Sequence, residues 1–390
     1  MGSLKGTNQE SGRPYNRRIV LEAIRQHGPI ERADIASRVG LTVQTVANII
    51  RDLEELHLIN GVRSPRRGRG SPATGFTLNP AGAYAVGVNV TPRGLEAALV
   101  DLAGAIIAEE RVSLPRPDAE RSFAEIGRLV EDFRHGAGQR SMLGVGLAMP
   151  GPFDVESMSF VGPTTLENWR GVSVAERLSQ VAGLAAFIET DHAAAALGEG
   201  LYGAGRTFRD FYYLYFGVGL GGSMVHDGLP VRGARRNAGE IGHVPMVVNG
   251  RPCSCGNRGC LERYLSLEAY ARRVPIVGRA EWIAEAAPLL RNAVVTIENL
   301  FDPETIVIGG IAEDDLLDEL IAAAEPLPTS VADRRERAGP RLRRSASGHA
   351  VLRGAASLAF SGALSPRFGT LFAQPPGQDK DTNFARNRVA

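Results

Sequence analysis

The first 60 residues alternate short amphipathic segments with turn signals. Apolar residues recur every three or four positions from Tyr15 to His27, which predicts a helix that ends before the Gly-Pro pair at 28–29. A second short helix is expected over ERADIASRVG, with Gly40 as its C-terminal stop. The residues of these helices that are predicted to face a core are Ile19, Val20, Ala23, Ile24, Ile35, Ala36 and Val39.

The stretch LTVQTVANIIRDLEELHLI predicts a third helix, with Thr42 placed to cap its N-terminus. Its buried stripe is expected to consist of Val46, Ile49, Ile50, Leu53 and Leu56. Its outward side is expected to carry Gln44, Thr45, Asn48 and Arg51. Two short helices joined by a tight turn, the second opening with small polar and amide side chains, are typical of a helix-turn-helix that reads DNA.

After this helix, LINGVRS and ATGFTL predict two strands around the basic tip PRRGRGSP. Such a hairpin completes a winged helix-turn-helix over residues 13–78, with Arg66, Arg67 and Arg69 following the DNA backbone or entering the minor groove. The alternative is a three-helix protein-interaction module with a solvated arginine loop. The agreement of helix pattern, wing and charge favours DNA binding, and adds Thr42 to the predicted DNA contacts.

From residue 80 onward, apolar strands alternate with helical segments. YAVGVNV and MLGVGLAMPG predict buried strands, AAFIETD leads into the alanine-rich helix HAAAALGEGLYG, and FYYLYFGVGLGGSMVHDG predicts a hairpin. This alternation indicates an α/β domain over residues 80–362. Residues 364–390 lack periodicity and are expected to form a mobile tail.

Composition narrows the class of protein. A chain of 390 residues with 44% hydrophobic and 22% charged residues is long enough for two or three cored domains and is neither fibrous nor disordered. No apolar run approaches the roughly 20 residues of a membrane span, and the polar start does not read as a signal peptide. We therefore expect a cytoplasmic protein.

The charge is uneven along the chain. The net charge of +1 combines residues 1–80, where 12 lysine and arginine residues face 7 acidic ones, with a remainder in which acidic residues are in excess. Only the first segment is thus suited to a polyanion such as DNA.

Five motifs of the second part carry a family resemblance: GVGLAMPGPFD, ETDHAAAALGE, NAGEIGH, CSCGNRGCLE and IVIGG. Together they resemble the ROK family, which groups bacterial sugar kinases with sugar-responsive transcriptional repressors of the Mlc, NagC and xylose-repressor type. The resemblance covers about residues 80–362. It implies the two-lobed actin-like ATPase fold (ribonuclease H-like), with a sugar in the cleft.

All three cysteines of the chain lie within residues 253–260. With His243 they give the spacing H-x9-C-x-C-x4-C for His243, Cys253, Cys255 and Cys260. Three thiolates and one imidazole suit tetrahedral zinc in a closed structural site, and the ROK resemblance implies zinc on the same residue types. Free thiols in a glycine-rich loop are the alternative interpretation.

The resemblance also implies the residues that hold a sugar. It assigns hydrogen bonds with sugar hydroxyls to Asp191, Glu240, His243 and Glu262, and Asn168 is a weaker candidate. Asp191 follows a predicted strand, where α/β folds place ligands. Loop capping or solvated charge is the alternative for Glu240 and Glu262. Thr190 replaces the Asn of the family pattern, which leaves the identity of the sugar open.

Both phosphate loops of a ROK kinase are altered. Where the family has D-x-G-G-T, the chain reads NVTPR at 89–93, and where it has T-G-T-G the chain reads FGVG at 216–219. An amide replaces the acid, Pro92 removes an amide donor, and the second loop has no hydroxyl. Because phosphoryl transfer depends on positioning and charge neutralisation, we expect no catalysis.

The sequence therefore predicts a DNA-binding repressor of carbohydrate-utilisation genes that a sugar releases, with structural zinc and a homodimeric or tetrameric assembly. One alternative is an active sugar kinase with a fused DNA-binding domain. Another is a binding module whose main partner is a protein.

Overall fold

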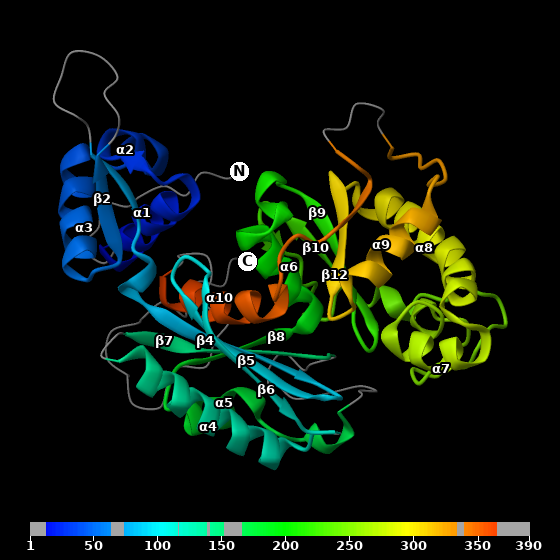
Figure 1. Cartoon of the computed structure of the whole chain (residues 1–390). Coiled ribbons are helices and arrows are strands. Elements are labelled where there is room, and N and C mark those ends of the chain that lie inside the picture. The colour runs from blue at the N-terminus through cyan, green and yellow to red at the C-terminus, as the bar shows by residue number, and fades with distance from the viewer. Residues whose placement is uncertain are drawn as a thin grey trace.

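The computed structural model describes residues 13–63, 74–115, 117–138, 141–151, 166–333 and 339–364. Figure 1 shows a small N-terminal domain beside two sheet-containing lobes, with helices α6 and α10 between the two sheets. The predicted DNA contacts Arg66, Arg67 and Arg69 lie outside the described residues, as do residues 365–390 of the predicted tail.

The N-terminal domain is a three-helix unit with a small antiparallel sheet. Its elements are α1 (Arg13–His27), β1 (Ile30–Glu31), α2 (Arg32–Val39), α3 (Val43–Glu55), β2 (Ile59–Arg63) and β3 (Thr74–Leu78). The strand order is β1-β3-β2, so β1 adds an edge strand that the sequence did not predict. Gly40 ends α2 in the left-handed conformation at φ 67°, and the Thr42 side chain accepts a hydrogen bond from the N–H of Thr45, as predicted.

The prediction that Leu56 belongs to the buried stripe of α3 is wrong. Leu56 is 50% exposed, whereas the other four members of the stripe are buried. The helix ends at Glu55, and Leu56 caps it with its N–H on the carbonyl of Asp52. The chain therefore leaves the helical period, and Leu58, 8% exposed, enters the core instead.

The first lobe is built on a five-stranded sheet of order β6-β5-β4-β7-β8. Its elements are β4 (Tyr84–Thr91), β5 (Gly94–Asp101), β6 (Ile106–Ser113), α4 (Ala119–Ala137), β7 (Met142–Met149), α5 (Val174–Ala182) and β8 (Ala186–Thr190). Strands β4, β7 and β8 are parallel, and β5 and β6 are antiparallel to their neighbours. Helices α4 and α5 cover one face of the sheet around Trp169 and Phe123.

The second lobe has a five-stranded sheet of order β11-β10-β9-β12-β13. Its elements are α6 (Asp191–Tyr202), β9 (Phe211–Phe216), β10 (Leu220–His226), β11 (Leu229–Pro230), α7 (Leu267–Val277), α8 (Arg279–Phe301), β12 (Thr305–Gly310), α9 (Asp314–Ala324) and β13 (Leu342–Arg344). Short 3-10 helices occur before and within both lobes: η2 (Pro80–Gly82), η3 (Glu167–Trp169), η4 (Ala204–Thr207), η5 (Ile241–His243) and η6 (Leu261–Arg263). Helices α7, α8 and α9 cover one face of this sheet.

Helix α6 and the last helix, α10 (Ala350–Leu364), pack together between the two sheets. Their approach is too close for side chains: a Cβ atom at Gly198 would lie 2.0 Å from the carbonyl oxygen of Ala350, and one at Gly354 would lie 1.7 Å from that of Ala194. Glycine is therefore required where these two helices cross. Their contact joins the two lobes.

The N-terminal domain shares a hydrophobic core with the first lobe. Ile19 and Ile24 of α1 belong to the same buried cluster as Leu352 and Phe360 of α10. The cluster also includes Leu197 of α6. The position of the N-terminal domain is thus coupled to the pair of helices between the lobes. Within the described residues, no helix is long and apolar enough to cross a bilayer.

Candidate functional site

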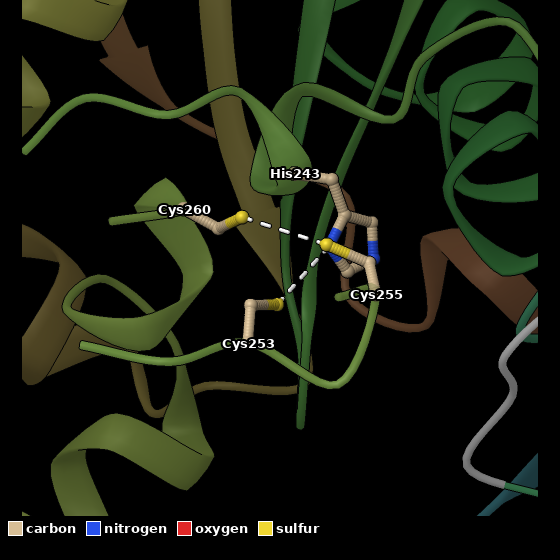
Figure 2. Close-up of side chains that lie close together, drawn as sticks. All are labelled: His243, Cys253, Cys255 and Cys260. Atoms are coloured by element: carbon tan, nitrogen blue, oxygen red, sulfur yellow. Dashed lines mark hydrogen bonds between the residues drawn. The ribbon is translucent and has the colours of Figure 1, made fainter. Parts of the chain in front are cut away.

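His243 and the three cysteines converge in one small cluster (Figure 2). Their ligand atoms all lie within 4.8 Å of one another. Cys253 Sγ is 3.5 Å from His243 Nδ1, and Cys255 Sγ is 3.6 Å from Cys260 Sγ. A tetrahedral ion with bonds near 2.3 Å separates its sulfur ligands by roughly 3.8 Å. The cluster therefore has the composition and dimensions of a metal site.

Two glycines shape the loop that holds the cysteines. Gly256 and Gly259 have φ values of 94° and 76°, in the region that favours glycine. A Cβ atom at Gly259 would lie 1.8 Å from the carbonyl oxygen of Val247, so no other residue fits there. The N–H of Cys253 donates to the carbonyl of Asn257 at 2.9 Å, which closes the turn between the first two thiols and the third.

The thiols differ in acidity. Burial raises the pKa of Cys255, but the hydrogen bond from the backbone of Asn257 and the neighbouring groups outweigh it and lower this pKa to about 7. Burial and the adjacent thiols raise the pKa of Cys260 to about 12. Proximity thus favours ionisation of Cys255 over that of Cys260, and a bound cation would stabilise both thiolates.

Beside the cluster, a cavity of about 760 Å³ lies between the two lobes. It is lined by all five residues predicted to bind a sugar: Asn168, Asp191, Glu240, His243 and Glu262. They come from four elements. Asn168 lies in η3 and Asp191 starts α6. Glu240 and His243 lie at the two ends of η5, and Glu262 lies in η6. The structure therefore brings together residues that are up to 94 positions apart in the chain.

His243 connects the metal cluster with the cavity. Its Nδ1 faces Cys253, whereas its Nε2 lies 4.0 Å from Glu240 Oε2. Glu262 Oε1 lies 3.8 Å from His243 Nδ1. One ring nitrogen is thus available for a metal ion while the other faces a carboxylate of the cavity.

Asp191 lies directly after β8, at the start of α6, where its Oδ1 accepts a hydrogen bond from the N–H of His192 at 2.8 Å. Burial raises the pKa of Asp191 above that of an ordinary carboxyl, and the charge of Glu240 adds to this effect, against a lowering by His192. The cavity therefore holds a carboxylate that is poorly solvated. Such an acceptor gains most from a ligand that brings hydroxyl donors.

The two stretches that correspond, by the family resemblance, to the phosphate loops form tight turns at the cavity wall. Pro92 and Arg93 form the two-residue connection between β4 and β5, and Asn89 before them is fully buried. In the second loop, the N–H of Gly217 donates to the carbonyl of Gly219 at 2.9 Å across Val218. These turns present Pro92 and Val218 to the cavity, where neither side chain can bind phosphate.

The sequence did not predict several other residues of the cavity wall. His192, Tyr215 and Arg263 also line it. His192 and Arg263 each follow a predicted site residue directly, so a search that included the neighbours of Asp191 and Glu262 would have found them. Tyr215 lies within a fully buried strand, and its pattern gave no signal of a cavity.

Three of the predicted DNA-contacting side chains share one face of α3. Gln44, Asn48 and Arg51 are exposed. Gln44 Nε2 and an Arg51 guanidinium nitrogen both donate to Asn48 Oδ1, at 3.4 and 3.1 Å. Thr42 and Thr45 lie at the start of the helix, with their hydroxyl oxygens 2.8 Å apart. The face is polar, exposed and organised around Asn48.

Models of two families match the chain. The model of the ROK family matches residues 85–280, half of the chain, and a model described as winged helix-turn-helix DNA-binding matches residues 13–60. The second match confirms the predicted winged helix.

Curated relatives match at low identity. The xylose repressor of Bacillus spizizenii is 27% identical over 256 residues, which are 65% of this chain and 66% of that protein. The repressor Mlc of Escherichia coli is 26% identical over 257 residues, 65% of this chain and 63% of its own. The match thus spans slightly less than two thirds of these two relatives. The dual regulator NagC of Escherichia coli is 27% identical over 343 residues, 79% of this chain and 83% of NagC.

Solved structures show the same fold. A ROK family transcriptional regulator, described as a homologue of Mlc from Escherichia coli, superposes with a TM-score of 0.72 at 24% identity, covering 92% of this chain and 98% of the other. A ROK glucokinase from Streptomyces griseus, solved with glucose and AMPPNP, gives 0.60 at 24% identity, covering 72% and 100%. The predicted two-lobed actin-like ATPase fold is thereby confirmed.

Proposed function

The chain belongs to the ROK family, and we propose that it is a DNA-binding transcriptional repressor that a sugar releases from its operator. One observation carries this proposal. A single hydrophobic cluster joins a winged helix to a lobe that helps to form a polar cavity. Because its operator lies on the chromosome, the protein acts in the cytoplasm.

The winged helix supplies the DNA contacts. The face of α3 around Asn48 and Gln44 enters the major groove, where amide side chains pair with base edges. Thr42, Thr45 and Arg51 contact the flanking phosphates. Arg66, Arg67 and Arg69 of the wing follow the backbone or the minor groove, as the basic excess of this segment supports.

The cavity takes the sugar. Asp191, Glu240 and Glu262 accept hydrogen bonds from its hydroxyl groups, and Asn168 adds a polar contact from the first lobe. The cysteine cluster with His243 takes zinc, which the three thiols and one imidazole favour over harder ions. Zinc there fixes the loop between Glu240 and Glu262 and leaves His243 Nε2 for the sugar.

Helix α6 joins sensing to DNA binding. Its first residue, Asp191, lies at the cavity, and its last residue, Tyr202, lies about 16.5 Å away next to α10. Helix α10 in turn packs against α1 of the winged helix. Closure of the lobes on a sugar shifts α6 and α10 together and moves the two winged helices of a homodimer out of register with a palindromic operator.

Fluorescence anisotropy on DNA from the promoter region of its own gene, titrated with sugars at fixed salt, tests this proposal. Release by one sugar identifies the effector and the direction of the response together. Tight binding that no sugar changes contradicts sugar control and points to a protein partner. Failure to bind that DNA specifically contradicts the repressor.

An active sugar kinase is the second candidate, because the fold is shared with a glucokinase. Against it stand Pro92 and Val218, which replace phosphate-binding groups at the cavity wall, and the buried amide of Asn89, which replaces an acid. Coupled measurement of ADP release with hexoses and amino sugars separates the two candidates, and we expect no release above background.

A further inference from the structure

His192 has an unusual position for a histidine. It is the second residue of α6, it is only 4% exposed, and it lines the cavity next to Asp191. Among the described residues, neither of its ring nitrogens has a hydrogen-bond partner. The imidazole of His192 therefore lies at the cavity wall, and both of its nitrogen atoms are shielded from solvent and have no hydrogen-bond partner in the described part of the chain.

Packing holds the ring in this position. A Cβ atom at Gly221 of β10 would lie 2.9 Å from its Cδ2, and one at Gly239 would lie 3.0 Å from its Cε1. The ring therefore fits between two glycines, one of which directly precedes Glu240. Glycine at both positions leaves the space that the ring occupies, because a side chain at either one would meet it.

An unpaired buried polar group destabilises a folded protein, so it calls for an explanation. Two cavity-lining residues among those described contain such atoms, His192 and Arg263. Arg263 still donates to Glu268 at 2.8 Å through its guanidinium group. In His192 both polar atoms lack a partner, which singles it out as a group that a ligand completes.

We infer that His192 is a specificity-determining contact for the sugar, an inference that rests on the proposed function of the cavity. The carboxylates of Asp191, Glu240 and Glu262 only accept hydrogen bonds. A neutral imidazole has one donor and one acceptor, which matches a hydroxyl group in either tautomer. His192 thus selects sugars that place one hydroxyl group against the start of α6.

This pairing makes the site discriminating. A sugar that lacks this hydroxyl leaves the imidazole unpaired in the closed cavity, so it loses the hydrogen bond and retains the desolvation cost. The affinity for the matching monodeoxy sugar is expected to be about 10- to 100-fold weaker than for the parent sugar.

The experiment is isothermal titration calorimetry on the full-length, zinc-loaded protein with D-glucose, D-xylose and N-acetyl-D-glucosamine. Monodeoxy analogues of whichever sugar binds are then titrated into the unsubstituted protein and into His192→Ala, His192→Asn and His192→Gln. Ser223→Ala is the matched control, because Ser223 of β10 is also buried with an unpaired hydroxyl but does not line the cavity.

We expect His192→Ala to weaken binding of the parent sugar about 10-fold or more while leaving the weaker affinity for one deoxy analogue unchanged. The discrimination between the two sugars then collapses. A role in packing alone would weaken both sugars by the same factor and keep their ratio, which would overturn the inference. Partial rescue by Asn points to a contact through Nδ1, and rescue by Gln to a contact through Nε2.

Two further outcomes are distinguishable. Parent affinity that is the same in His192→Ala as in the unsubstituted protein overturns this inference and leaves the proposed function intact. Failure of all three sugars to bind the unsubstituted protein, with specific DNA binding preserved, contradicts the sugar-binding part of the proposed function and the role of His192 together.

Discussion

The hydroxyl groups of Tyr202 and Ser357 lie 3.1 Å apart, where the end of α6 meets α10. Burial raises the pKa of Tyr202, although the positive charge of Arg25 of α1 acts in the opposite direction. The pair therefore lies where the second lobe, α10 and the winged helix meet. It adds a polar contact to a junction that apolar packing also holds.

Loss of this contact should weaken the link between sugar and DNA. We expect Tyr202→Phe to retain operator affinity without sugar, but to need a higher sugar concentration for release, because α6 and α10 are less firmly joined. A double-mutant cycle with Ser357→Ala, read by chemical denaturation, should give a coupling energy of about 0.5–1.5 kcal/mol. Additive single effects would show that the two hydroxyl groups do not interact.

The cysteine cluster should be needed for the shape of the cavity. We expect Cys255→Ser to lose zinc, measured by elemental analysis, and with it the sugar response, because the loop between Glu240 and Glu262 is no longer fixed. Arg258→Ser is the control: Arg258 is exposed in the same loop and contributes no atom to the cluster. A sugar response that survives loss of the metal would contradict the proposed role of zinc.

We expect the Asp191 carboxylate to lower the stability of the folded protein and to contribute to sugar binding. Because its pKa is raised by burial, the folded chain holds a proton at pH values where the unfolded chain, with the ordinary value of 3.8, has lost it. Stability therefore falls as pH rises through the window between 3.8 and the raised pKa. We expect Asp191→Asn to be at least as stable at pH 7 and to lose sugar binding.

The same carboxyl predicts how sugar affinity depends on pH. The unsubstituted protein should bind sugar most tightly above the raised pKa of Asp191, and less tightly as acidification protonates this acceptor. Calorimetric titrations across this range test the point, with the exposed Asp34→Asn as the control. An affinity that does not change with pH would mean that Asp191 does not contact the sugar as a carboxylate.

On the DNA side, the two kinds of contact should respond differently. We expect Asn48→Ala to relax sequence preference at one base pair by about 1–3 kcal/mol, since Asn48 is the centre of the exposed face of α3. Arg51→Ala should weaken binding to all DNA and reduce the slope of affinity against salt by about 1. Arg177→Ala, an exposed arginine of α5, controls for the change in net charge.

The corrected edge of α3 can be tested by stability alone. Leu53 is fully buried and Leu56 is 50% exposed. We expect Leu53→Ala to lower the free energy of unfolding by about 2–5 kcal/mol and Leu56→Ala by less than about 1 kcal/mol. Urea denaturation followed by circular dichroism measures both. Equal losses of unfolding free energy would show that Leu56 is buried after all.

Local signals predicted the winged helix well. The cap at Thr42 and the stop at Gly40 each depend on a few neighbouring atoms, so sequence fixes them. Leu56 was placed wrongly because a helical period was extended one residue beyond the end of its helix. The strand β1 has only two residues and exists because β3 lies beside it, which no local pattern encodes.

The cavity could be predicted only in part. Asp191, Glu240 and Glu262 stand in motifs that carry the family resemblance, and the structure brings them to one cavity. His192 lies inside the motif ETDHAAAALGE, but its place there predicts no role, because its surroundings include Gly221 and Gly239, which lie 29 and 47 positions further along the chain. The close crossing of α6 and α10 likewise joins glycines whose roles appear only when the chain is folded.

The shared cluster of α1 and α10 has a consequence for the exchange of parts between regulators. A chimaera cut at the Leu78-Asn79-Pro80 junction would separate Ile19 and Ile24 from Leu352 and Phe360, near the other end of the chain. A DNA-binding domain from another protein, joined at this junction, would not have a surface that fits the apolar side chains of α10. Helix α10 belongs to the packing of both the winged helix and the lobes, so the two parts cannot be exchanged as independent modules.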